Sequence, residues 1–411
     1  MKTFPGDISI QDYTYSLPDE RIALHPLAER DQSKLLVYKD GDIQESRFVN
    51  LPAYLPENSL LVCNNTKVIN ARLHFKKTTG STIEIFCLEP AGEITEYSTV
   101  MQQSGRSTWK CFIGGAAKWK SDVLVKQIMI RNDVIQLYAR MIEKQSNAYL
   151  VSFEWKPSQY SFAEIIEYAG DIPLPPYIKR TTASADTERY QTIYAAHSGS
   201  VAAPTAGLHF TQSVLDRLAS KNIHTANITL HVGAGTFKPV TTPTMEQHEM
   251  HAEWIEVEKS FIEQLIQHNG PIVATGTTSV RTLESLYWLG VKAFVSPHAI
   301  NLSIQQWDAY SQLLQEPNLS TKEALQSLLK WLEMKKKNAL FTKTQLLIAP
   351  GYAFKLVQVM ITNFHQPHST LLLLVAAAVR KDWRKIYEYA LENDFRFLSY
   401  GDSSLLFMAE S

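Results

Sequence analysis

Residues Ile272–Leu286 read IVATGTTSVRTLESL, and this stretch passes from an apolar segment through a polar turn into a helical pattern. The run Ile272–Thr275 predicts a short strand that is buried on both faces of a sheet. Val280, Leu283 and Leu286 then recur at the spacing of one helix face. Strand, polar turn and helix in direct succession are typical of an α/β fold.

Further stretches extend the same pattern. Leu356–Ile361 predicts a second strand, which leads through the loop Thr362–His368 into a helix that begins at Ser369. Phe210–Lys221 is a helix candidate and precedes the alternating strand Thr225–Val232. Together these units predict a large α/β domain, barrel-like or open. Folds of both kinds carry their sites on the polar loops after the strands.

Between residues 71 and 155 the pattern changes to short strands with no long helix among them. β-Branched and aromatic residues dominate these strands, and glycine or polar turns separate them, which is typical of a small all-β barrel or sandwich. We therefore expect residues 1–70 and 156–411 to form a discontinuous α/β catalytic domain, with residues 71–155 inserted as an all-β domain. The strands predicted in the insertion are Thr82–Leu88, Thr108–Ile113, Val123–Ile130, Ile135–Met141 and Ala148–Trp155.

Residues 290–345 look like a helical addition to the α/β scheme. Ser320 and Glu323 have the spacing of a capping box, and an apolar stripe follows them. Lys335–Lys337 closes this predicted helix, where cations are favourable. The simplest interpretation is a covering helix with a solvated end, and a patch for RNA phosphates or a partner is the alternative.

The composition is that of a globular protein without general affinity for nucleic acid. The 411 residues include 40 Lys plus Arg and 41 Asp plus Glu, which gives a formal net charge of -1. A protein that coats nucleic acid would be strongly basic, so any RNA contact has to be a local patch.

Cysteine content and apolar runs indicate the compartment. Cys63, Cys87 and Cys111 are too few and too widely spaced for a disulfide framework, so we expect each to be a small buried side chain. The most apolar segment, Leu371–Val379, is much shorter than the roughly 20 residues of a membrane span. A cytoplasmic protein without a membrane segment is expected.

Two glycine-containing loops are candidates for ligand binding. His231–Phe237 follows a strand and contains Gly233 and Gly235, which permit close approach of backbone to a ligand. It lacks both the third glycine of a dinucleotide fingerprint and the GKS or GKT ending of a P-loop. A nucleoside-binding loop and a tight structural turn both fit this pattern.

The segment Ala203–Phe210 offers small residues against which a flat base could lie. Its polar members are Thr205 and His209, with Gly207 between them. The structural alternative is a helix N-terminus capped by Thr205 or Thr211.

Gly276–Arg281 brings hydroxyl groups and backbone N–H groups to a predicted helix N-terminus, a position that favours anions. Arg281 could hold a carboxylate or phosphate with two hydrogen bonds. Its structural alternative is an ion pair with Glu284 or Glu253.

Histidines are available for proton transfer in two further segments. Thr362–His365 places Asn363 and His365 directly after a predicted strand. His248, His251 and Glu253 lie close together, but no helical HExxH pattern supports a metal there. We favour an acid/base or hydrogen-bonding role for this group, with surface histidines as the alternative.

Taken together, these segments resemble the S-adenosylmethionine:tRNA ribosyltransferase-isomerase family of queuosine biosynthesis. The resemblance follows the family's order over most of the chain, except parts of the β region and the addition. The matching segments are Leu24–Leu27 with Arg30-Asp31, Asn64–Ile69 with Ala71–Leu73, Pro173–Ile178, Glu188–Thr192, Val201–Phe210, His231–Phe237, His248 with Met250, His251 and Glu253, Gly276–Ser285, Pro350–Tyr352 with Phe354-Lys355, Thr362–His365 and Phe395–Asp402.

The resemblance implies a reaction and its partners. The ribosyl group of S-adenosylmethionine is transferred and isomerised onto 7-aminomethyl-7-deazaguanine at the tRNA anticodon wobble position. The product is epoxyqueuosine, and adenine and methionine are released. S-adenosyl-L-methionine is then a co-substrate, no other cofactor and no metal is expected, and a monomer is the working expectation.

The resemblance also implies roles for individual residues. Acid/base candidates are the four histidines of the matching loops, with two carboxylates behind them, and hydroxyl, glycine and amide positions are expected to bind substrate. The catalytic set is His209, His231, His251, His365, Glu253 and Asp402. The substrate-binding set is Thr205, Gly207, Gly233, Gly235, Thr277, Thr278, Ser279, Arg281, Asn363 and Tyr352.

The sequence departs from the family's pattern at three places. Ala252 stands where serine is usual, Gln366 where leucine is usual, and Ala376–Ala378 where Ser-Ala-Phe is usual. Two alternatives therefore stay open. One is a related enzyme that uses S-adenosylmethionine with another acceptor, and the other is a non-catalytic RNA- or nucleoside-binding protein on the same scaffold.

Overall fold

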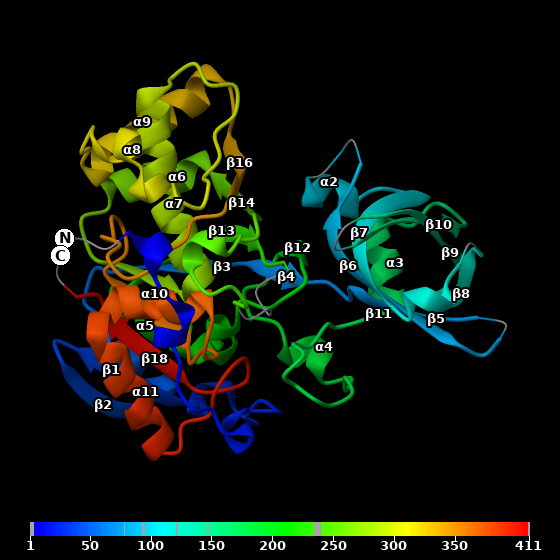
Figure 1. The fold of residues 1–411 in the computed structure, drawn as a ribbon, viewed down its shortest axis with the longest axis horizontal. Coiled ribbons are helices and arrows are strands. Elements are labelled where there is room, and N and C mark those ends of the chain that lie inside the picture. Colours follow the sequence, from blue (N-terminus) through cyan, green and yellow to red (C-terminus); the bar gives the residue numbers. More distant parts are fainter. Residues whose placement is uncertain are drawn as a thin grey trace.

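Two large sheets organise the chain, and a short parallel pair of strands lies between them (Figure 1). The computed structural model describes residues 4–77, 79–92, 94, 96–120, 122–145, 148–233 and 240–409. Within these residues the fold is a mixed α/β arrangement. The connecting strands are β4 (Thr66–Val68) and β12 (His197–Ser200).

The larger sheet contains nine strands within the described residues. The pairs β13–β3, β3–β15, β15–β17 and β1–β18 are parallel, and the other neighbours are antiparallel. The order is linear, so of the two predicted forms the pairing is that of an open sheet. The strands in that order are β16 (Ala339–Thr344), β14 (Glu253–Glu258), β13 (His224–His231), β3 (Leu60–Asn64), β15 (Ile272–Thr275), β17 (Val359–Asn363), β18 (Ser403–Phe407), β1 (Lys34–Lys39) and β2 (Asp42–Arg47).

Helices cover both faces of this sheet, which explains why its central strands are apolar throughout. On one face Leu60 and Val62 pack with the side chains of α7 (Gly276–Val295), α10 (Thr370–Val379) and α11 (Trp383–Glu392). On the other face Leu61 and Cys63 pack with α1 (Leu51–Tyr54) and α5 (Gln212–Ala219). The alternation along β3 thus assigns successive residues to two separate cores.

The segment 290–345 covers α7 with α8 (Gln312–Gln315) and α9 (Thr321–Met334), and α6 (Lys259–Gln267) packs beside them. The predicted capping box at Ser320 and Glu323 is confirmed, with both reciprocal hydrogen bonds formed. Gly290 of α7 lies against the backbone of Ala324, so closely that a Cβ there would meet the Ala324 carbonyl oxygen at 2.1 Å. The addition is therefore a covering layer, and its last strand, β16, also extends the sheet.

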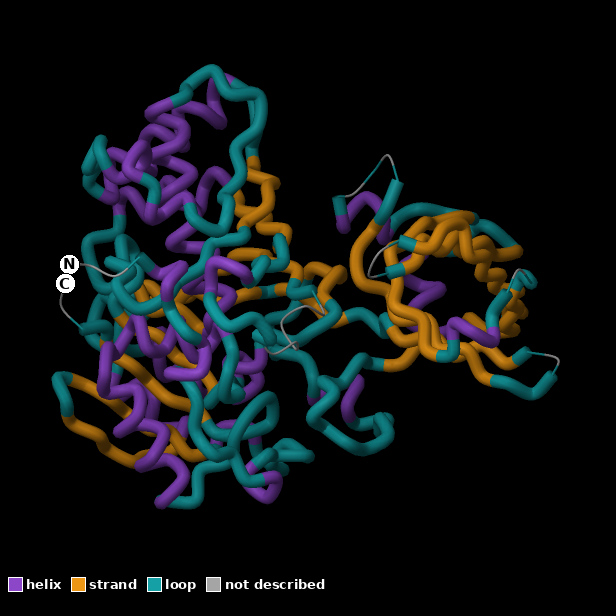
Figure 2. The backbone as a smooth tube through the Cα atoms, viewed as in Figure 1, coloured by secondary structure: helices purple, strands orange, loops and turns teal. Residues whose placement is uncertain are grey.

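The second sheet has seven strands in the described residues, all antiparallel, and it curls around helix α3 (Phe162–Ala169) (Figure 2). Phe162 inserts between the rings of Trp109, Phe153 and Trp155. A short helix, α2 (Tyr97–Met101), packs on the same core. The strands in order are β11 (Gly170–Asp171), β5 (Arg72–Lys76), β6 (Thr82–Pro90), β7 (Arg106–Gly114), β10 (Tyr149–Lys156), β9 (Asp133–Lys144) and β8 (Leu124–Ile130).

The five strands predicted in this region are present, and of the two predicted shapes, barrel or sandwich, they do not form the sandwich. The strands form one curled sheet and not the two facing sheets of a sandwich. Helix α3 and strand β11 also belong to this packing unit, so it extends to Asp171, past the predicted boundary at residue 155. Ser161 and Glu164 form the capping box that starts α3.

One predicted strand begins three residues later than expected. Leu356–Ile361 is apolar except at Gln358 and was predicted as a strand, but β17 begins only at Val359. The backbone N–H groups of Lys355, Leu356 and Val357 all donate to the buried carboxylate of Glu284. These groups are therefore not free for a sheet ladder, and Glu284 fastens the end of this loop to α7.

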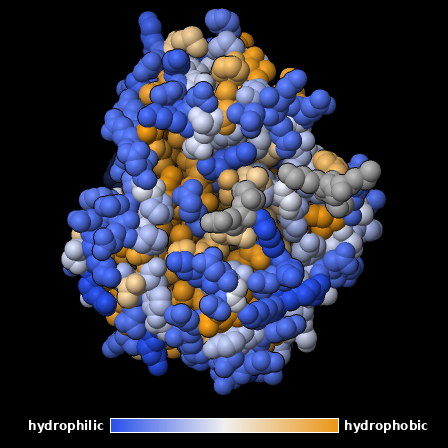
Figure 3. All heavy atoms as spheres, turned by 90° about the vertical axis from the view of Figure 1, so that its left-hand side faces the viewer, coloured by the Kyte–Doolittle hydropathy of each residue, from blue (hydrophilic) through white to orange (hydrophobic). Residues whose placement is uncertain are grey.

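Apolar segments and cysteines lie inside the molecule as expected. Leu371–Val379 falls within α10, whose side chains from Leu372 onward are buried. No helix of the described residues has both the length and the apolar character needed to cross a bilayer. The three cysteines are buried and free. Figure 3 shows the face near the two chain ends, where polar side chains cover most of the surface and apolar ones gather in a central band.

Candidate functional site

A pocket lies where parallel strands of the large sheet end, and we call it the α7 pocket. β13, β15 and β17 run in the same direction, so their carboxyl ends meet at one edge of the sheet. Gly276 turns the chain from β15 into α7 with a φ of +85°, a value that suits glycine. The lining residues include Tyr177, Ala202–Ala206, Val232, Gly276–Thr278, Arg281, Thr362–Gln366 and Ser399.

The N-terminus of α7 forms one wall of this pocket. The cap residue, Thr275, makes no side-chain cap hydrogen bond. Thr277 and Thr278 line the pocket, and the buried Thr278 Oγ1 has no hydrogen-bond partner among the described residues. The free N–H groups of a first helical turn together with such hydroxyls form a ready site for an anion. Ser279 does not take part, because its hydroxyl donates to the carbonyl of Thr275 at 2.7 Å.

Arg281 forms an ion pair with Glu253 of β14. This is one of the two ion pairs that the sequence offered as a structural role for this arginine. Both side chains are almost fully buried, with 6% and 3% of their surface exposed. Burial raises the pKa of Glu253, and the Arg281 guanidinium opposes that shift. Arg281 lines the α7 pocket while Glu253 lines a second cavity, so the ion pair forms part of the wall between them.

His365 is the histidine that lines the α7 pocket. Its Nε2 lies 2.9 Å from Thr362 Oγ1, and its backbone N–H donates to the hydroxyl of Tyr387. Burial lowers the pKa of His365 to about 4. The imidazole is therefore neutral at pH 7, a state in which it can accept a proton or a hydrogen bond from a ligand.

The second cavity lies between the two sheets, and we call it the inter-sheet cleft. It collects His231 and Glu253 from strands of the large sheet, Gly233 and His251 from the loops next to them, and Tyr97 from α2. His231 stacks on Tyr97 with 4.5 Å between ring centroids and bonds Thr66 Oγ1 through Nδ1 at 3.0 Å. Burial lowers the pKa of His231 to about 3.

His251 is exposed at this cleft, and an amide network fixes its loop. The Oε1 atom of Gln306 accepts the N–H of Met250 at 2.9 Å, and its Nε2 donates to the carbonyl of His248 at 2.7 Å. Gln345 donates to the carbonyl of Met250 at 2.8 Å. Both glutamines follow residue 290, so the added segment supports the histidine loop.

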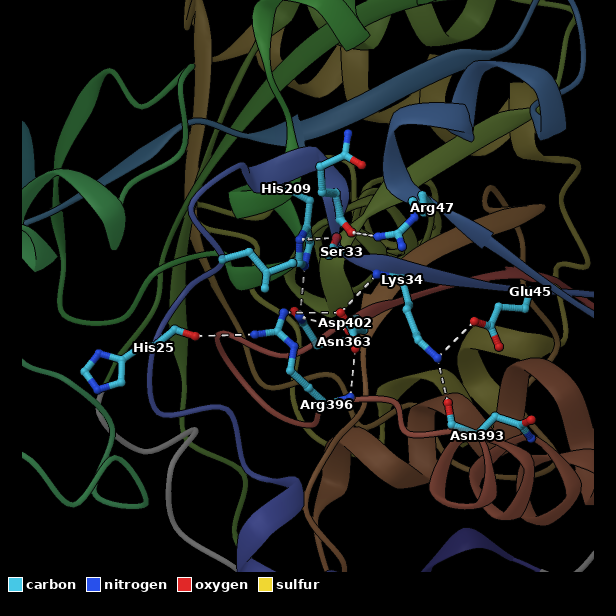
Figure 4. Close-up of polar contacts among 12 residues, drawn as sticks. His25, Ser33, Lys34, Glu45, Arg47, His209, Asn363, Asn393, Arg396 and Asp402 are labelled. Carbon is cyan, nitrogen blue, oxygen red and sulfur yellow. Dashed lines mark hydrogen bonds and ion pairs between the residues drawn. The ribbon is translucent and has the colours of Figure 1, made fainter.

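His209 and Asp402 do not line the α7 pocket but lie in a polar network beside it (Figure 4). His209 Nδ1 lies 2.8 Å from Ser33 Oγ, and Nε2 lies 3.4 Å from Asn363 Nδ2. The carboxylate of Asp402 accepts the backbone N–H groups of Lys34 and Arg396. Both ring nitrogens of His209 and both carboxylate oxygens of Asp402 are thus engaged by neighbouring residues.

The remaining predicted substrate-binding residues fall into separate places. Thr205 and Asn363 line the α7 pocket and bond to each other at 2.8 Å. Gly207 does not line it, since a Cβ there would meet the hydroxyl of Tyr194 at 2.1 Å, so packing requires this glycine. Tyr352 lies in a different groove and donates to Glu284. Gly235 lies outside the described residues.

Several residues of the two cavities were not singled out from the sequence. Tyr177 and Ser399 line the α7 pocket and bond to each other at 2.6 Å. Both occur in segments that carry the family resemblance, so that resemblance was the available signal. Tyr97 and Trp254 of the inter-sheet cleft had no such signal, because isolated aromatic residues in helices and strands are most often core.

Fold and cavities first define a class: a mixed α/β protein with an anion-suited pocket at its strand ends and buried neutral histidines beside it. Residues 10–406 match the family described as queuosine biosynthesis protein. The chain belongs to that family.

Relatives cover nearly the whole chain. The S-adenosylmethionine:tRNA ribosyltransferase-isomerase of Magnetococcus marinus is 35% identical over 409 residues, 98% of this chain and 96% of the relative. That of Natranaerobius thermophilus is 35% identical over 406 residues, 97% of this chain and 99% of the relative. A crystal structure of S-adenosylmethionine tRNA ribosyltransferase from Thermotoga maritima is 27% identical with a TM-score of 0.45, and the match covers 96% of this chain and 99% of that one.

Proposed function

We propose that the chain is an S-adenosylmethionine:tRNA ribosyltransferase-isomerase. It transfers and isomerises the ribosyl group of S-adenosylmethionine onto 7-aminomethyl-7-deazaguanine in tRNA, gives epoxyqueuosine, and releases adenine and methionine. Relatives of this name that match nearly the full length support the activity. The observation that carries the local assignment is the α7 pocket, where the buried, unpartnered Thr278 hydroxyl lies at an open helix N-terminus.

S-Adenosylmethionine fits the α7 pocket by its chemistry. Its methionine carboxylate suits the N–H groups of the first turn of α7 and the hydroxyls of Thr277 and Thr278. Its flat adenine suits the small residues of Ala202–Ala206, where backbone approaches the cavity. No other cofactor is proposed.

The reaction needs proton transfer at two positions. The sulfonium acidifies the ribose C5′ protons, so a base has to remove one of them, and adenine leaves more easily when an acid protonates it. His365 is a neutral imidazole inside the α7 pocket. His251 is the exposed imidazole of the adjoining cleft. These two are the proposed acid/base pair, with His231 and Glu253 behind them.

The tRNA acceptor reaches this site from the inter-sheet cleft, which adjoins the α7 pocket at the Arg281–Glu253 pair. The proposal divides the chain into an α/β catalytic domain and an inserted β domain that begins near residue 71. We further propose that the protein acts in the cytoplasm, where tRNA is modified, and that it is a monomer.

A second candidate function is supported by two departures from the family's pattern. Gln366 lines the α7 pocket and Ala252 lines the inter-sheet cleft, so both unusual residues face the proposed ligands. An enzyme that uses S-adenosylmethionine with a different acceptor would need changes at such positions.

Adenine release separates these functions. Purified protein is mixed with S-adenosylmethionine and one of three acceptors: tRNA with the aminomethyl-deazaguanine, the same tRNA with guanine, or the free aminomethyl base. We expect adenine to be released only in the mixture that contains the modified tRNA. Release with the free base alone supports a different acceptor, and ligand binding without adenine release identifies a binding protein.

A further inference from the structure

A third cavity contains a cluster of arginines, and we call it the arginine pocket. Arg30, which precedes β1, meets Arg189 at the end of helix α4 (Asp186–Arg189), and Arg396 follows α11. Ser399 lines both this cavity and the α7 pocket. Figure 4 shows Arg396 with Asp402 near the start of β1, at the edge where β17 ends. The arginine pocket therefore adjoins the proposed catalytic pocket.

Two of these arginines are held by backbone carbonyls and not by acids. Arg30 donates to the carbonyl oxygens of Gln191 at 2.6 Å and Glu188 at 3.0 Å. Arg189 donates to the carbonyl oxygens of Leu27 and Ala28. Among the described residues neither guanidinium forms an ion pair, and Arg189 Nε is buried without a hydrogen-bond partner.

The third guanidinium is only partly neutralised. Arg396 lies 3.2 Å from the carboxylate of Asp402, which also accepts two backbone N–H groups. Burial and the neighbouring Arg189 lower the pKa of Arg30, and Glu188 partly opposes that shift. Like charges therefore crowd one small cavity in a chain whose formal net charge is -1. An anion in the cavity would relieve this repulsion.

The chemistry of the cluster selects the kind of anion. A guanidinium held in place by carbonyls keeps its other N–H groups oriented, and arginines in this arrangement bind phosphate oxygens in pairs. We propose that the arginine pocket binds a backbone phosphate of the RNA acceptor, next to the nucleotide whose base enters the α7 pocket. This inference rests on the proposed function, since it assigns the RNA of that reaction to a surface.

The arginines also join separate segments of the chain, so their removal could disturb folding. Arg189 links α4 to Leu27 and Ala28, and Arg30 links the same region to Gln191. The test therefore uses a charge-conserving variant and a perturbation of the RNA. Arg217 is the matched control, because it too donates to a backbone carbonyl, that of Val49, but does not line the arginine pocket.

Binding of an anticodon stem-loop RNA to the full chain is measured by fluorescence anisotropy over a range of salt concentrations. Arg189→Gln should raise the Kd about tenfold, because charge-assisted hydrogen bonds to one phosphate are lost. The slope of log Kd against log salt should fall by about 0.7. Arg189→Lys should keep that slope, Arg217→Gln should bind like wild type, and the Kd for S-adenosylmethionine should stay unchanged in all three.

Neutral methylphosphonate linkages, placed one at a time around the wobble nucleotide, test the contact from the RNA side. One linkage should weaken binding to the wild-type protein and add no further loss to Arg189→Gln. Equal penalties in both proteins, or a wild-type Kd and salt slope in Arg189→Gln, overturn the proposal.

Inorganic phosphate distinguishes a site for free anions from one for RNA. Competition by phosphate against the stem-loop in wild type, lost in Arg189→Gln, supports the RNA assignment. Phosphate binding that leaves the RNA Kd unchanged overturns it. Failure of the proposed function has a different signature, because wild type would then release no adenine with modified tRNA whatever the arginine variants do to binding.

Discussion

Replacing one partner of the Arg281–Glu253 pair should destabilise the protein strongly. Glu253→Gln leaves a guanidinium that is 6% exposed and has lost its carboxylate. Breaking a buried ion pair in this way costs about 3–5 kcal/mol. For a chain of 411 residues the unfolding entropy is roughly 0.9 kcal/mol per kelvin, so Tm should fall by about 3–6 °C if the chain unfolds cooperatively.

The two single variants should differ in their dependence on pH. Arginine cannot lose its proton, so the unpaired charge that Glu253→Gln leaves behind persists between pH 6 and pH 9. Arg281→Met leaves a carboxyl group whose pKa burial already raises. Its folded state then binds a proton that the unfolded chain releases above its ordinary pKa, so stability should fall as the pH rises through the folded pKa.

The double variant Glu253→Gln with Arg281→Met completes the test. It leaves no buried charge at this position, so its stability should lie closer to wild type than that of either single variant. Urea unfolding followed by circular dichroism at several pH values measures all four proteins. Single variants within about 1 kcal/mol of wild type, or a double variant whose loss equals the sum of the two, would refute a buried, coupled pair.

Three further predictions concern ligand binding, the histidine loop and pH. Thr278→Val should raise the Kd for S-adenosylmethionine about tenfold in calorimetry and leave RNA binding unchanged, because it removes a hydroxyl that only the ligand can satisfy. Gln306→Ala should lower kcat more than it changes KM, because the His251 loop loses its amide contacts. Gln305→Ala, an exposed neighbour, should be neutral in the same assay. Unfolding free energy should decline as pH falls from about 6.5 towards 4, because burial lowers the pKa values of His209 and His365 to about 4 and the unfolded chain takes up protons first. A flat profile over this interval in urea titrations would contradict the buried neutral state.

Much of the fold could be predicted because it depends on local patterns. Ile272–Thr275 was predicted to be a strand and forms β15, and the Ser320 capping box starts α9 as predicted. The error at Leu356 has a long-range cause. A carboxylate from Glu284, more than 70 residues earlier, takes the N–H groups that a strand would use, and apolar periodicity carries no trace of such a partner.

The site was only partly predictable for the same reason. Thr277, Thr278 and Asn363 follow strands and do line one pocket, because parallel strands end at one edge. His209 and Tyr352 occur in equally suggestive loops, yet each is bound to structural partners. Arg30 and Arg189 are 159 residues apart in the sequence, yet they line the same cavity. A single sequence contains no signal for a pair at that separation.

The central claim is most directly tested by the fate of the tRNA itself. Wild-type protein, S-adenosylmethionine and tRNA with the aminomethyl-deazaguanine are incubated, the RNA is digested, and nucleosides and free adenine are quantified by mass spectrometry. Epoxyqueuosine is expected in the digest, with adenine in equal molar amount. Unchanged deazaguanine nucleoside in tRNA, with folded protein that still binds S-adenosylmethionine, would contradict the central claim.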